Sequence, residues 1–177
     1  MPRISPVDPS KTSSEVQSVF QEIEKGFGMI PNLFLTMAHY PPLLKANWEK
    51  VKAVMMKGKL PRKVKEAIAL VVSKDNGCQY CIQAHSAALR GLKVADEAIA
   101  LILKDDLASA GFDTKAMALI QFAQAANNTP HSIPDEITEA IQEAGVSDAE
   151  LVEALGVMEI FVAFNRFLDA LEVDIDF

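Results

Sequence analysis

The chain has 177 residues, of which 50% are hydrophobic and 23% are charged, and its formal net charge is −7. This composition is too apolar for a disordered chain, and a chain of this length can bury a large core without disulfide or metal staples. No run of Lys and Arg is longer than two residues. The acidic balance therefore argues against a nucleic-acid partner, which would require a basic patch.

The chain contains no segment typical of a membrane protein or of a secreted one. Its first residues show no apolar leader, and its longest apolar stretch, residues 151–171, is interrupted by Glu153, Glu159, Asn165 and Arg166. We therefore expect no membrane partner and a cytoplasmic location.

Apolar residues recur every three or four positions along almost the whole chain, which predicts an all-α fold. Thr12 and Glu15 form a capping-box pattern before the first helix, and Ser147 and Glu150 form one before the last. Prolines, glycines and the turn signal Asn76-Gly77 mark the boundaries between them. The expected helices cover a first segment ending near Gly26 or Gly28, residues 32–38, 41–56 and 61–73, a segment that contains both cysteines and ends near Gly91, and residues 95–104, 113–127, 134–145 and 148–171.

A weak internal repeat is predicted in the second part of the chain. A shift of 52 residues lays residues 60–102 over 112–154 with six identities and with the apolar register kept. We expect a single domain over residues 1–177, made of an N-terminal helical segment (1–58), a first repeat (60–102) and a second repeat (112–171). The second copy lacks the cysteines and the histidine of the first, so the chemistry is expected in the first.

The only two cysteines, Cys78 and Cys81, are three positions apart at the start of a predicted helix. A disulfide that closes so short a loop constrains little of the unfolded chain, so this pair is better suited to redox chemistry or metal binding. Helical residues three apart have Cα atoms about 5 Å apart, within the range that a disulfide spans. His85, four residues after Cys81, lies on the same face. One helix face therefore presents two thiols and an imidazole.

The reactive form of cysteine is the thiolate, and at the ordinary pKa of a free cysteine only about 3% is present at pH 7. The positive end of the helix and His85, acting directly or through water, are expected to activate Cys81. The imidazole needs an acceptor to orient it, and Glu66 on the preceding helix is the candidate. Because two helices joined by the short turn at residues 75–77 pack antiparallel, Glu66 can lie beside His85.

Other interpretations of these residues stay open. The thiols can be an incidental pair on a core face, since free cysteine is among the most buried residue types. A zinc site is the second alternative: the two thiols and the imidazole supply three ligands, and His131 or Asp75 would supply the fourth. Glu66 can also be an exposed helix residue among neighbouring lysines.

The pattern Glu66-x11-Cys78-x2-Cys81-x3-His85 resembles that of the AhpD-like alkylhydroperoxidases in the carboxymuconolactone decarboxylase superfamily. The resemblance extends to the segments PNLFLTMAHYPPLLKANW and FVAFNRFLDAL, which are similar to the peroxidase-related branch of that group. It implies an all-α, AhpD-like fold of repeated helical units and a homo-oligomer, either a trimer or a hexamer.

The resemblance also implies roles for individual residues. Cys81 would be the peroxidatic nucleophile that becomes a sulfenic acid, and Cys78 the resolving thiol that forms the redox-active disulfide with it. His85, supported by Glu66, would relay the proton. The implied function is that of an antioxidant enzyme, a thiol-dependent peroxidase that needs no cofactor and no metal. An external dithiol, in some relatives a lipoyl-bearing protein, would reduce the disulfide. Several relatives have a second histidine where this chain has Tyr80, and a phenol is a poor base near neutral pH.

Two further functions are alternatives to the peroxidase. One is a non-enzymatic redox-sensing or stress-adaptor oligomer whose disulfide state alters partner binding. The other is a carboxymuconolactone decarboxylase-like enzyme, whose chemistry does not depend on a dithiol. Turnover separates the peroxidase from the redox sensor, because a peroxidase consumes peroxide repeatedly whereas a sensor is oxidised once.

Overall fold

A computed structural model describes residues 1–177, and it contains helices but no strands, with 69% of the residues helical. The all-α prediction is therefore confirmed. A short 3₁₀ turn (Pro9–Lys11) comes first, and a π-helical segment (Lys52–Met56) continues the third helix. The α-helices are α1 (Ser14–Phe27), α2 (Asn32–Met37), α3 (Pro41–Val51), α4 (Arg62–Asp75), α5 (Gln79–Gly91), α6 (Asp96–Leu103), α7 (Thr114–Asn128), α8 (Asp135–Glu143) and α9 (Asp148–Leu171).

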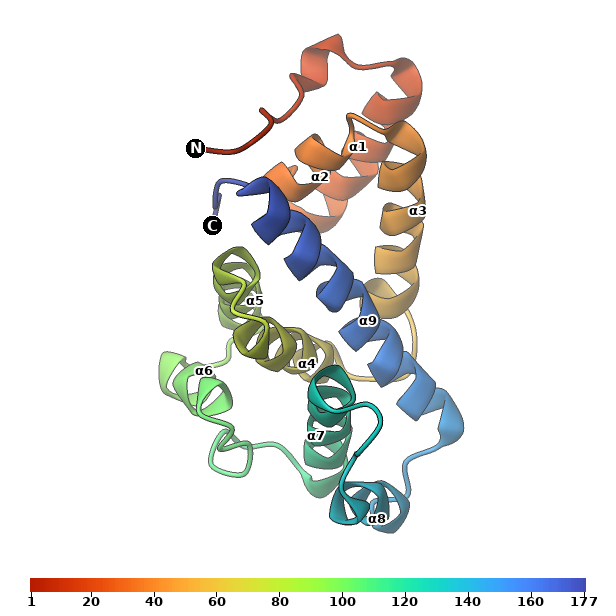
Figure 1. Cartoon of the computed structure of the whole chain (residues 1–177), viewed down its shortest axis with the longest axis vertical. Helices are drawn as coiled ribbons and strands as arrows, with labels where there is room; N and C mark the ends of the chain where they lie inside the picture. The colour runs from red at the N-terminus through yellow and green to blue at the C-terminus, as the bar shows by residue number, and fades with distance from the viewer.

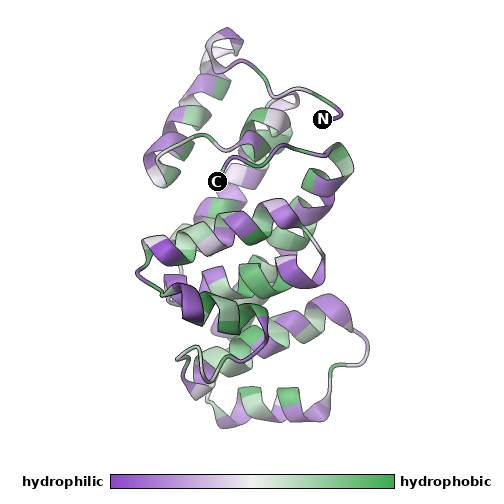
Figure 2. Ribbon diagram, turned by 90° about the vertical axis from the view of Figure 1, so that its left-hand side faces the viewer, coloured by the Kyte–Doolittle hydropathy of each residue, from purple (hydrophilic) through white to green (hydrophobic).

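The long helix α9 crosses the molecule diagonally and links its two ends (Figure 1). Helices α1, α2 and α3 lie at one end, α6, α7 and α8 lie at the other, and α4 and α5 lie between them. Helix α4 packs against α5, α7 and α9, and its residues 67–72 are completely buried. A helical stretch that is apolar on all sides, as residues 67–72 are, must be enclosed in this way. Most of the other helices carry both hydrophilic and hydrophobic residues along their length, as Figure 2 shows.

The first and last helices differ in how their N-termini are capped. Ser13, and not Thr12, caps α1, because the Ser13 hydroxyl accepts a hydrogen bond from the Val16 backbone N–H at 3.3 Å. The Thr12 hydroxyl donates to a carbonyl of the preceding turn at 2.8 Å, so the predicted Thr12 capping box is wrong. Ser147 and Glu150 do form the capping box predicted for α9.

The helix that presents the dithiol starts one residue later than predicted, because Cys78 is the N-cap of α5 and does not lie inside it. Its backbone is extended, with φ −77° and ψ 100°, and Cys81 lies in the first turn of the helix. Gly77 has φ +78°, a left-handed conformation that glycine adopts at little cost. This turn reverses the chain, so α4 and α5 lie side by side in contact.

A buried ion pair joins α4 to α9, and the same carboxylate holds the segment before α4. Lys65 is only 2% exposed, and its ammonium nitrogen lies 2.6 Å from Glu153 Oε1. The Glu153 carboxylate also accepts hydrogen bonds from the backbone N–H groups of Lys59 and Leu60, at 2.7 and 3.2 Å. Gly58 has φ +102°, and a Cβ at this position would overlap the Glu153 carboxylate. The absence of a side chain at residue 58 therefore permits the pairing of a buried lysine.

We expect Gly58→Ala to lower the free energy of unfolding by about 2–4 kcal/mol. The positive φ costs a residue with a Cβ about 1–2 kcal/mol, and displacement of Glu153 leaves Lys65 buried with a poorer partner. Gly145→Ala is the matched control, because Gly145 also has a positive φ, 62°, but open space around its Cβ position. Urea denaturation gives the free energy of unfolding of both variants. An equal loss of unfolding free energy in Gly58→Ala and Gly145→Ala would show that the Glu153 contacts contribute nothing.

The predicted internal repeat stays a prediction. Helices α4 and α7 begin 52 residues apart, as do α6 and α9, whereas α5 and α8 begin 56 residues apart. The helix starts thus share the offset of the sequence repeat in two of three pairs. We propose a single domain with the boundaries given above.

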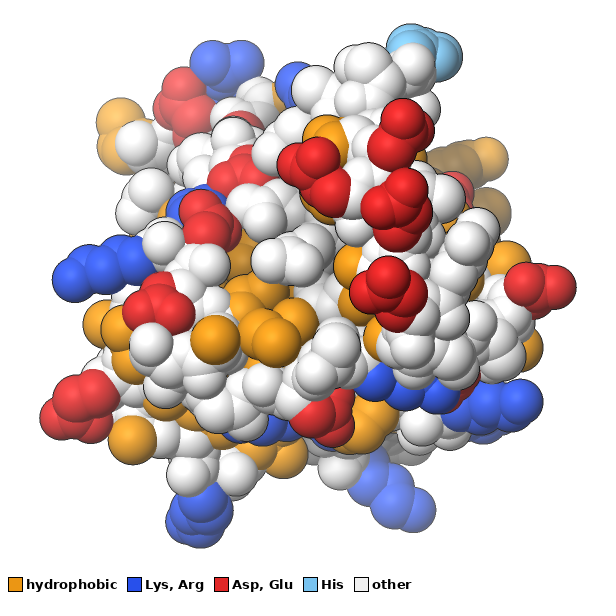
Figure 3. Space-filling view, turned by 90° about the horizontal axis from the view of Figure 1, so that it is seen from below, with side chains coloured by type: hydrophobic (Ala, Val, Ile, Leu, Met, Phe, Trp, Pro, Cys, Tyr) orange, Lys and Arg blue, Asp and Glu red, His pale blue; other side chains and the backbone are white.

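The lower end of the molecule, seen in Figure 3, has acidic side chains gathered on one part of its face. Most Lys and Arg side chains on this face stand near its rim, which is consistent with the net charge of −7. None of the helices combines the length and the apolar character that crossing a membrane requires.

Candidate active site

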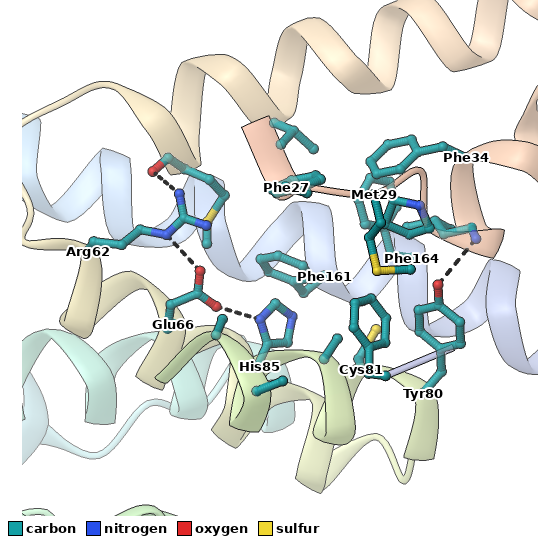
Figure 4. Close-up of a pocket in the computed structure, with 18 residues that line it drawn as sticks. Phe27, Met29, Phe34, Arg62, Glu66, Tyr80, Cys81, His85, Phe161 and Phe164 are labelled. Carbon is teal, nitrogen blue, oxygen red and sulfur yellow. Dashed lines mark hydrogen bonds and ion pairs between the residues drawn. The ribbon is translucent and has the colours of Figure 1, made fainter. Parts of the chain in front are cut away.

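The predicted contact between Glu66 and His85 is present in the structure. The two side chains come from the adjacent helices α4 and α5, and His85 Nδ1 lies 2.7 Å from Glu66 Oε2 (Figure 4). Glu66 is 1% exposed and His85 is 6% exposed. The interpretation of Glu66 as an exposed helix residue is therefore wrong, because the helix that carries it is enclosed on all sides.

Arg62 extends this contact into a chain of three side chains, which the sequence analysis did not identify. Its Nε donates to Glu66 Oε1 at 2.6 Å, and its Nη1 donates to the Met55 carbonyl at 3.1 Å. Arg62 stands four residues before Glu66, a spacing at which helical side chains meet. That spacing is the signal by which the sequence could have indicated the pair.

The carboxylate of Glu66 is held in its ionised form. Burial raises the pKa of Glu66, but the hydrogen bond and charge of His85 and the guanidinium of Arg62 outweigh it, so that the pKa lies below its ordinary value. Both carboxylate oxygens are occupied, one by each partner. Glu66 is therefore placed to orient the imidazole and to stabilise its protonated form.

The second nitrogen of the imidazole, His85 Nε2, makes no hydrogen bond within the protein. Because Glu66 is an acceptor, His85 Nδ1 carries hydrogen and Nε2 of the neutral ring is an acceptor. His85 Nε2 is buried and has no hydrogen-bond partner. The ring stands edge-on to Phe161, with the ring centres 4.2 Å apart, and faces the cavity that Figure 4 shows. An unpaired buried acceptor in a cavity wall is suited to exchanging a proton with a bound molecule.

The two cysteines are free thiols, both buried, and they lie 3.8 Å apart. This separation is longer than a disulfide bond of about 2 Å, so forming the disulfide requires the two side chains to turn toward each other. Cys81 lines the cavity and Cys78 does not. The structure thus brings together all four residues expected from the sequence, with one sulfur facing the cavity and the other next to it.

The surroundings of the two thiols favour ionisation of Cys78 over ionisation of Cys81. The hydrogen bond from Cys81 lowers the pKa of Cys78 despite its burial, and the Cys81 backbone N–H at the start of α5 lowers it further. The hydrogen bond to Cys78 and burial raise the pKa of Cys81, against hydrogen bonds from Asn165 and Ser73 that lower it. His85 Nε2 makes no hydrogen bond to Cys81, so a proton passes between them only through a bridging water or substrate.

A cavity of about 300 Å³ opens in front of Cys81 and His85. The residues that form its walls come from the end of α1 and the segment after it, from α2, from the end of α3 and the segment after it, from α4, α5 and α9, and from Phe177. Fourteen of the 18 lining residues are hydrophobic. The aromatic ones are Phe27, Phe34, Tyr80, Phe161, Phe164 and Phe177. Such a lining favours a compact apolar molecule, with Arg62, Glu66 and His85 at one polar end.

Tyr80 stands in the wall of this cavity and is not a base. Its hydroxyl oxygen accepts a hydrogen bond from the Leu33 backbone N–H at 3.3 Å. Burial raises the pKa of Tyr80 far above neutrality. The residue that replaces a second histidine therefore joins α5 to α2, a contact between distant segments that the sequence alone did not predict.

The zinc alternative finds no support in this arrangement. No group of three or more His, Cys, Asp and Glu side chains has the geometry of a metal site. His131 lies in an exposed loop and Asp75 hydrogen-bonds to Gln124 and Asn128, so neither joins the two thiols.

Comparisons with known proteins relate parts of this chain to a family and to one curated enzyme. Residues 41–125 match the carboxymuconolactone decarboxylase family. An alkyl hydroperoxide reductase of Mycobacterium tuberculosis is 30% identical over 99 residues, which are 56% of this chain and 29% of that protein. The chain thus spans less than a third of the length of this curated relative.

Solved structures share the fold over nearly the whole chain. An AhpD-core, peroxidase-related protein from Ralstonia eutropha has a TM-score of 0.87 and 24% identity, covering 99% of this chain and 92% of that one. A variant of the debrominase Bmp8 in complex with 2,3,4-tribromopyrrole has a TM-score of 0.85 and 22% identity, covering 98% of this chain and 91% of that one. At these identities the likeness establishes the fold, an AhpD-like helical one.

Proposed function

We propose that this chain is a thiol-dependent peroxidase acting on alkyl hydroperoxides, since residues 41–125 match the carboxymuconolactone decarboxylase family and the fold is AhpD-like. The observation that carries the proposal is the position of Cys81 in the cavity wall, with Cys78 3.8 Å away. The contacts from Arg62 through Glu66 to His85, whose Nε2 has no partner, support it.

In the first step Cys81 gives its proton to His85 Nε2 through a bridging water or the hydroperoxide itself, and the resulting thiolate attacks the terminal oxygen of the hydroperoxide. The O–O bond breaks, Cys81 becomes a sulfenic acid, and the alkoxide that leaves takes a proton and departs as an alcohol. His85 Nε2 faces the cavity and, when protonated, supplies this proton. Glu66 stabilises the imidazolium, and Arg62 keeps the carboxylate in place.

In the second step the Cys78 thiolate attacks the sulfur of the sulfenic acid. The S–O bond breaks, a disulfide forms, and the hydroxide that leaves is protonated to water. The two thiols have then supplied two electrons to one peroxide molecule. An external dithiol restores both thiols by thiol–disulfide exchange. Because Cys78 is 0% exposed and Cys81 lines the cavity, this dithiol enters through the cavity and attacks the sulfur of Cys81. A lipoyl-bearing protein as reductant and a trimeric or hexameric assembly stay predictions.

The proposal is tested by peroxide consumption with dithiothreitol and with dihydrolipoamide as electron donors. The peroxidase is expected to turn over many peroxide molecules per chain. A redox sensor would consume one equivalent and stop, and a decarboxylase-like enzyme would consume none. Metal analysis of the same preparation tests the zinc alternative, for which about one zinc per chain would be required.

Reductive dehalogenation is a second candidate, favoured by the aromatic lining of the cavity. The same two thiols would supply two electrons and become a disulfide, and one of their protons would form the new C–H bond of a halogenated aromatic ring as its carbon–halogen bond breaks and halide leaves. The solved debrominase complex with 2,3,4-tribromopyrrole supports the comparison at the level of the fold. Release of bromide from this compound in the presence of dithiothreitol, faster than peroxide consumption, would favour the second candidate over the first.

A further inference from the structure

The residues that follow α9, which we call the strap (172–177), turn back over the helices that hold the candidate site. Glu172 has φ 51° and ψ 45°, a left-handed conformation that is uncommon for a residue with a Cβ. The Val173 backbone N–H donates to the Leu168 carbonyl at 3.1 Å, a bond that reverses the chain at a helix end. Arg3 pairs with the Glu172 carboxylate at 2.9 Å. The end of the strap, marked C in Figure 1, therefore lies close to α5.

Asn32, the first residue of α2, holds the strap by two hydrogen bonds. Its backbone N–H donates to Asp176 Oδ2 at 2.5 Å, and its side-chain Nδ2 donates to the Asp174 carbonyl at 3.1 Å. The other carboxylate oxygen, Asp176 Oδ1, is buried and has no hydrogen-bond partner. Burial of an unpaired polar atom costs free energy, so the docked strap is attached at one place and at some cost.

These contacts place Phe177 at the mouth of the cavity. Its ring lines the cavity and stands edge-on to Tyr80, with the ring centres 5.4 Å apart. Phe177 is 46% exposed, whereas Phe161 and Phe164, which line the same cavity, are 7% and 2% exposed. A lining residue that is so exposed stands where the cavity meets the solvent. A molecule that travels from the solvent to Cys81 therefore passes this ring.

The other exposed aromatic residue of the lining, Phe27, is fixed more firmly than Phe177. Phe27 is the last residue of α1, and its ring packs against Phe34 and Trp48, with ring centres 6.1 and 5.6 Å away. Both of these neighbours are 2% exposed and belong to the core. Phe177 packs against one aromatic ring, that of Tyr80, and its segment is held by a single residue of α2. Segments with few buried contacts open most readily, so Phe177 is the movable part of the rim.

We propose that Phe177, positioned by Asp176, is a specificity-determining residue that selects by size the molecules that reach Cys81. With the strap docked, the mouth admits compact apolar hydroperoxides, suited to a cavity of about 300 Å³. Bulkier molecules enter only when the strap leaves α2. The inference rests on the proposed function for the identity of the substrate. Its test, however, needs no peroxide.

The test is alkylation of Cys81 by two maleimides of different size, N-ethylmaleimide and N-(1-pyrenyl)maleimide, with Cys78→Ser as the background so that only one thiol reacts. Both reagents react with the thiolate, so the ratio of their rates at one pH reports access and not the thiol pKa. We expect Phe177→Ala to raise the rate with the pyrenyl reagent about tenfold and the rate with N-ethylmaleimide less than about twofold. Circular dichroism checks folding, which a half-exposed ring should not control.

Asp176→Ala tests the docking of the strap, and Ile175→Ala is the matched control. Loss of the carboxylate that accepts from Asn32 should raise the ratio of the two rates about threefold, because the ring then blocks the mouth only part of the time. Asp176→Asn keeps an oxygen acceptor and should raise the ratio less. Ile175 lies on the same strap, is 41% exposed and does not line the cavity, so its replacement should leave the ratio within about twofold.

An unchanged ratio in folded Phe177→Ala would overturn the inference, whatever the peroxide assay shows. Equal acceleration of both maleimides would also overturn it, because the ring would then cover Cys81 without selecting by size. So would an Ile175→Ala effect as large as that of Phe177→Ala, or an unchanged ratio in Asp176→Ala. A raised ratio in a protein that consumes no peroxide would support the inference and remove the proposed function.

Discussion

Replacement of Cys81 by serine is expected to lower kcat/KM for peroxide by about 1,000-fold or more, because a neutral hydroxyl replaces the thiolate that attacks the O–O bond. Cys81 lines the cavity and Cys78 does not, so no second sulfur is in place to take over the attack. Peroxide consumption with dithiothreitol measures the loss. Activity above a hundredth of the unchanged protein would end the assignment of Cys81 as nucleophile.

The matched variant, Cys78→Ser, should stop the same reaction one step later. Cys81 still reduces one peroxide, but no thiolate is present to displace hydroxide from the sulfenic acid. Dimedone should therefore trap about one sulfenic acid per chain, located at Cys81 by mass spectrometry. The double variant serves as the control and should take up no dimedone. A dimedone adduct at Cys78 in Cys81→Ser would reverse the two roles.

Glu66→Gln has the second large expected effect, on both activity and stability. A neutral amide cannot stabilise a protonated His85, so we expect turnover to fall about 100-fold, the usual size of a general acid–base contribution. The variant also leaves the half-buried guanidinium of Arg62 without its carboxylate, which should lower the free energy of unfolding by about 2–3 kcal/mol. Urea denaturation and peroxide consumption measure the two effects on one preparation.

The stability effect of Glu66→Gln should depend on pH in a defined direction. The pKa of Glu66 in the folded protein lies below its value in the unfolded chain, which is about 4.3. The ionised carboxylate therefore stabilises the fold above about pH 4.3, and this contribution is lost as the pH falls through the folded pKa. The difference in unfolding free energy between Glu66→Gln and the unchanged protein should be largest at pH 7 and should shrink below pH 4. Glu97→Gln, an exposed position on α6, should show no such difference.

Helix positions were largely predictable because they depend on local periodicity, which the chain displays almost throughout. The errors occur at helix N-termini, where single hydrogen bonds decide. Thr12 lost the capping role to Ser13 because its hydroxyl bonds backward to the preceding turn. Cys78 caps α5 from outside the helix because the chain is still reversing direction at Gly77.

Only those parts of the candidate site that lie on one helix or on the helix next to it in the chain were predictable. Spacing alone places Cys81 and His85 on one face, and a short turn brings Glu66 beside them, as the 2.7 Å contact with His85 shows. Arg62 was within reach of the same reasoning but carried no obvious chemical role. Tyr80 was recognised as a departure from related sequences, yet its bond to Leu33 joins segments 47 residues apart.

The sequence by itself determined the helices, the adjacency of the two thiols and the presence of an imidazole one turn later, because each follows from the geometry of a single helix and its nearest neighbour. Only the tertiary structure decided that Cys81 faces an aromatic cavity while Cys78 does not, and that Asn165 of α9 reaches the Ser73 hydroxyl from 92 residues away. The partners and the burial that together set the pKa values of Glu66 and of the two thiols are created by the packing of α4, α5 and α9. No segment of the chain contains that information alone.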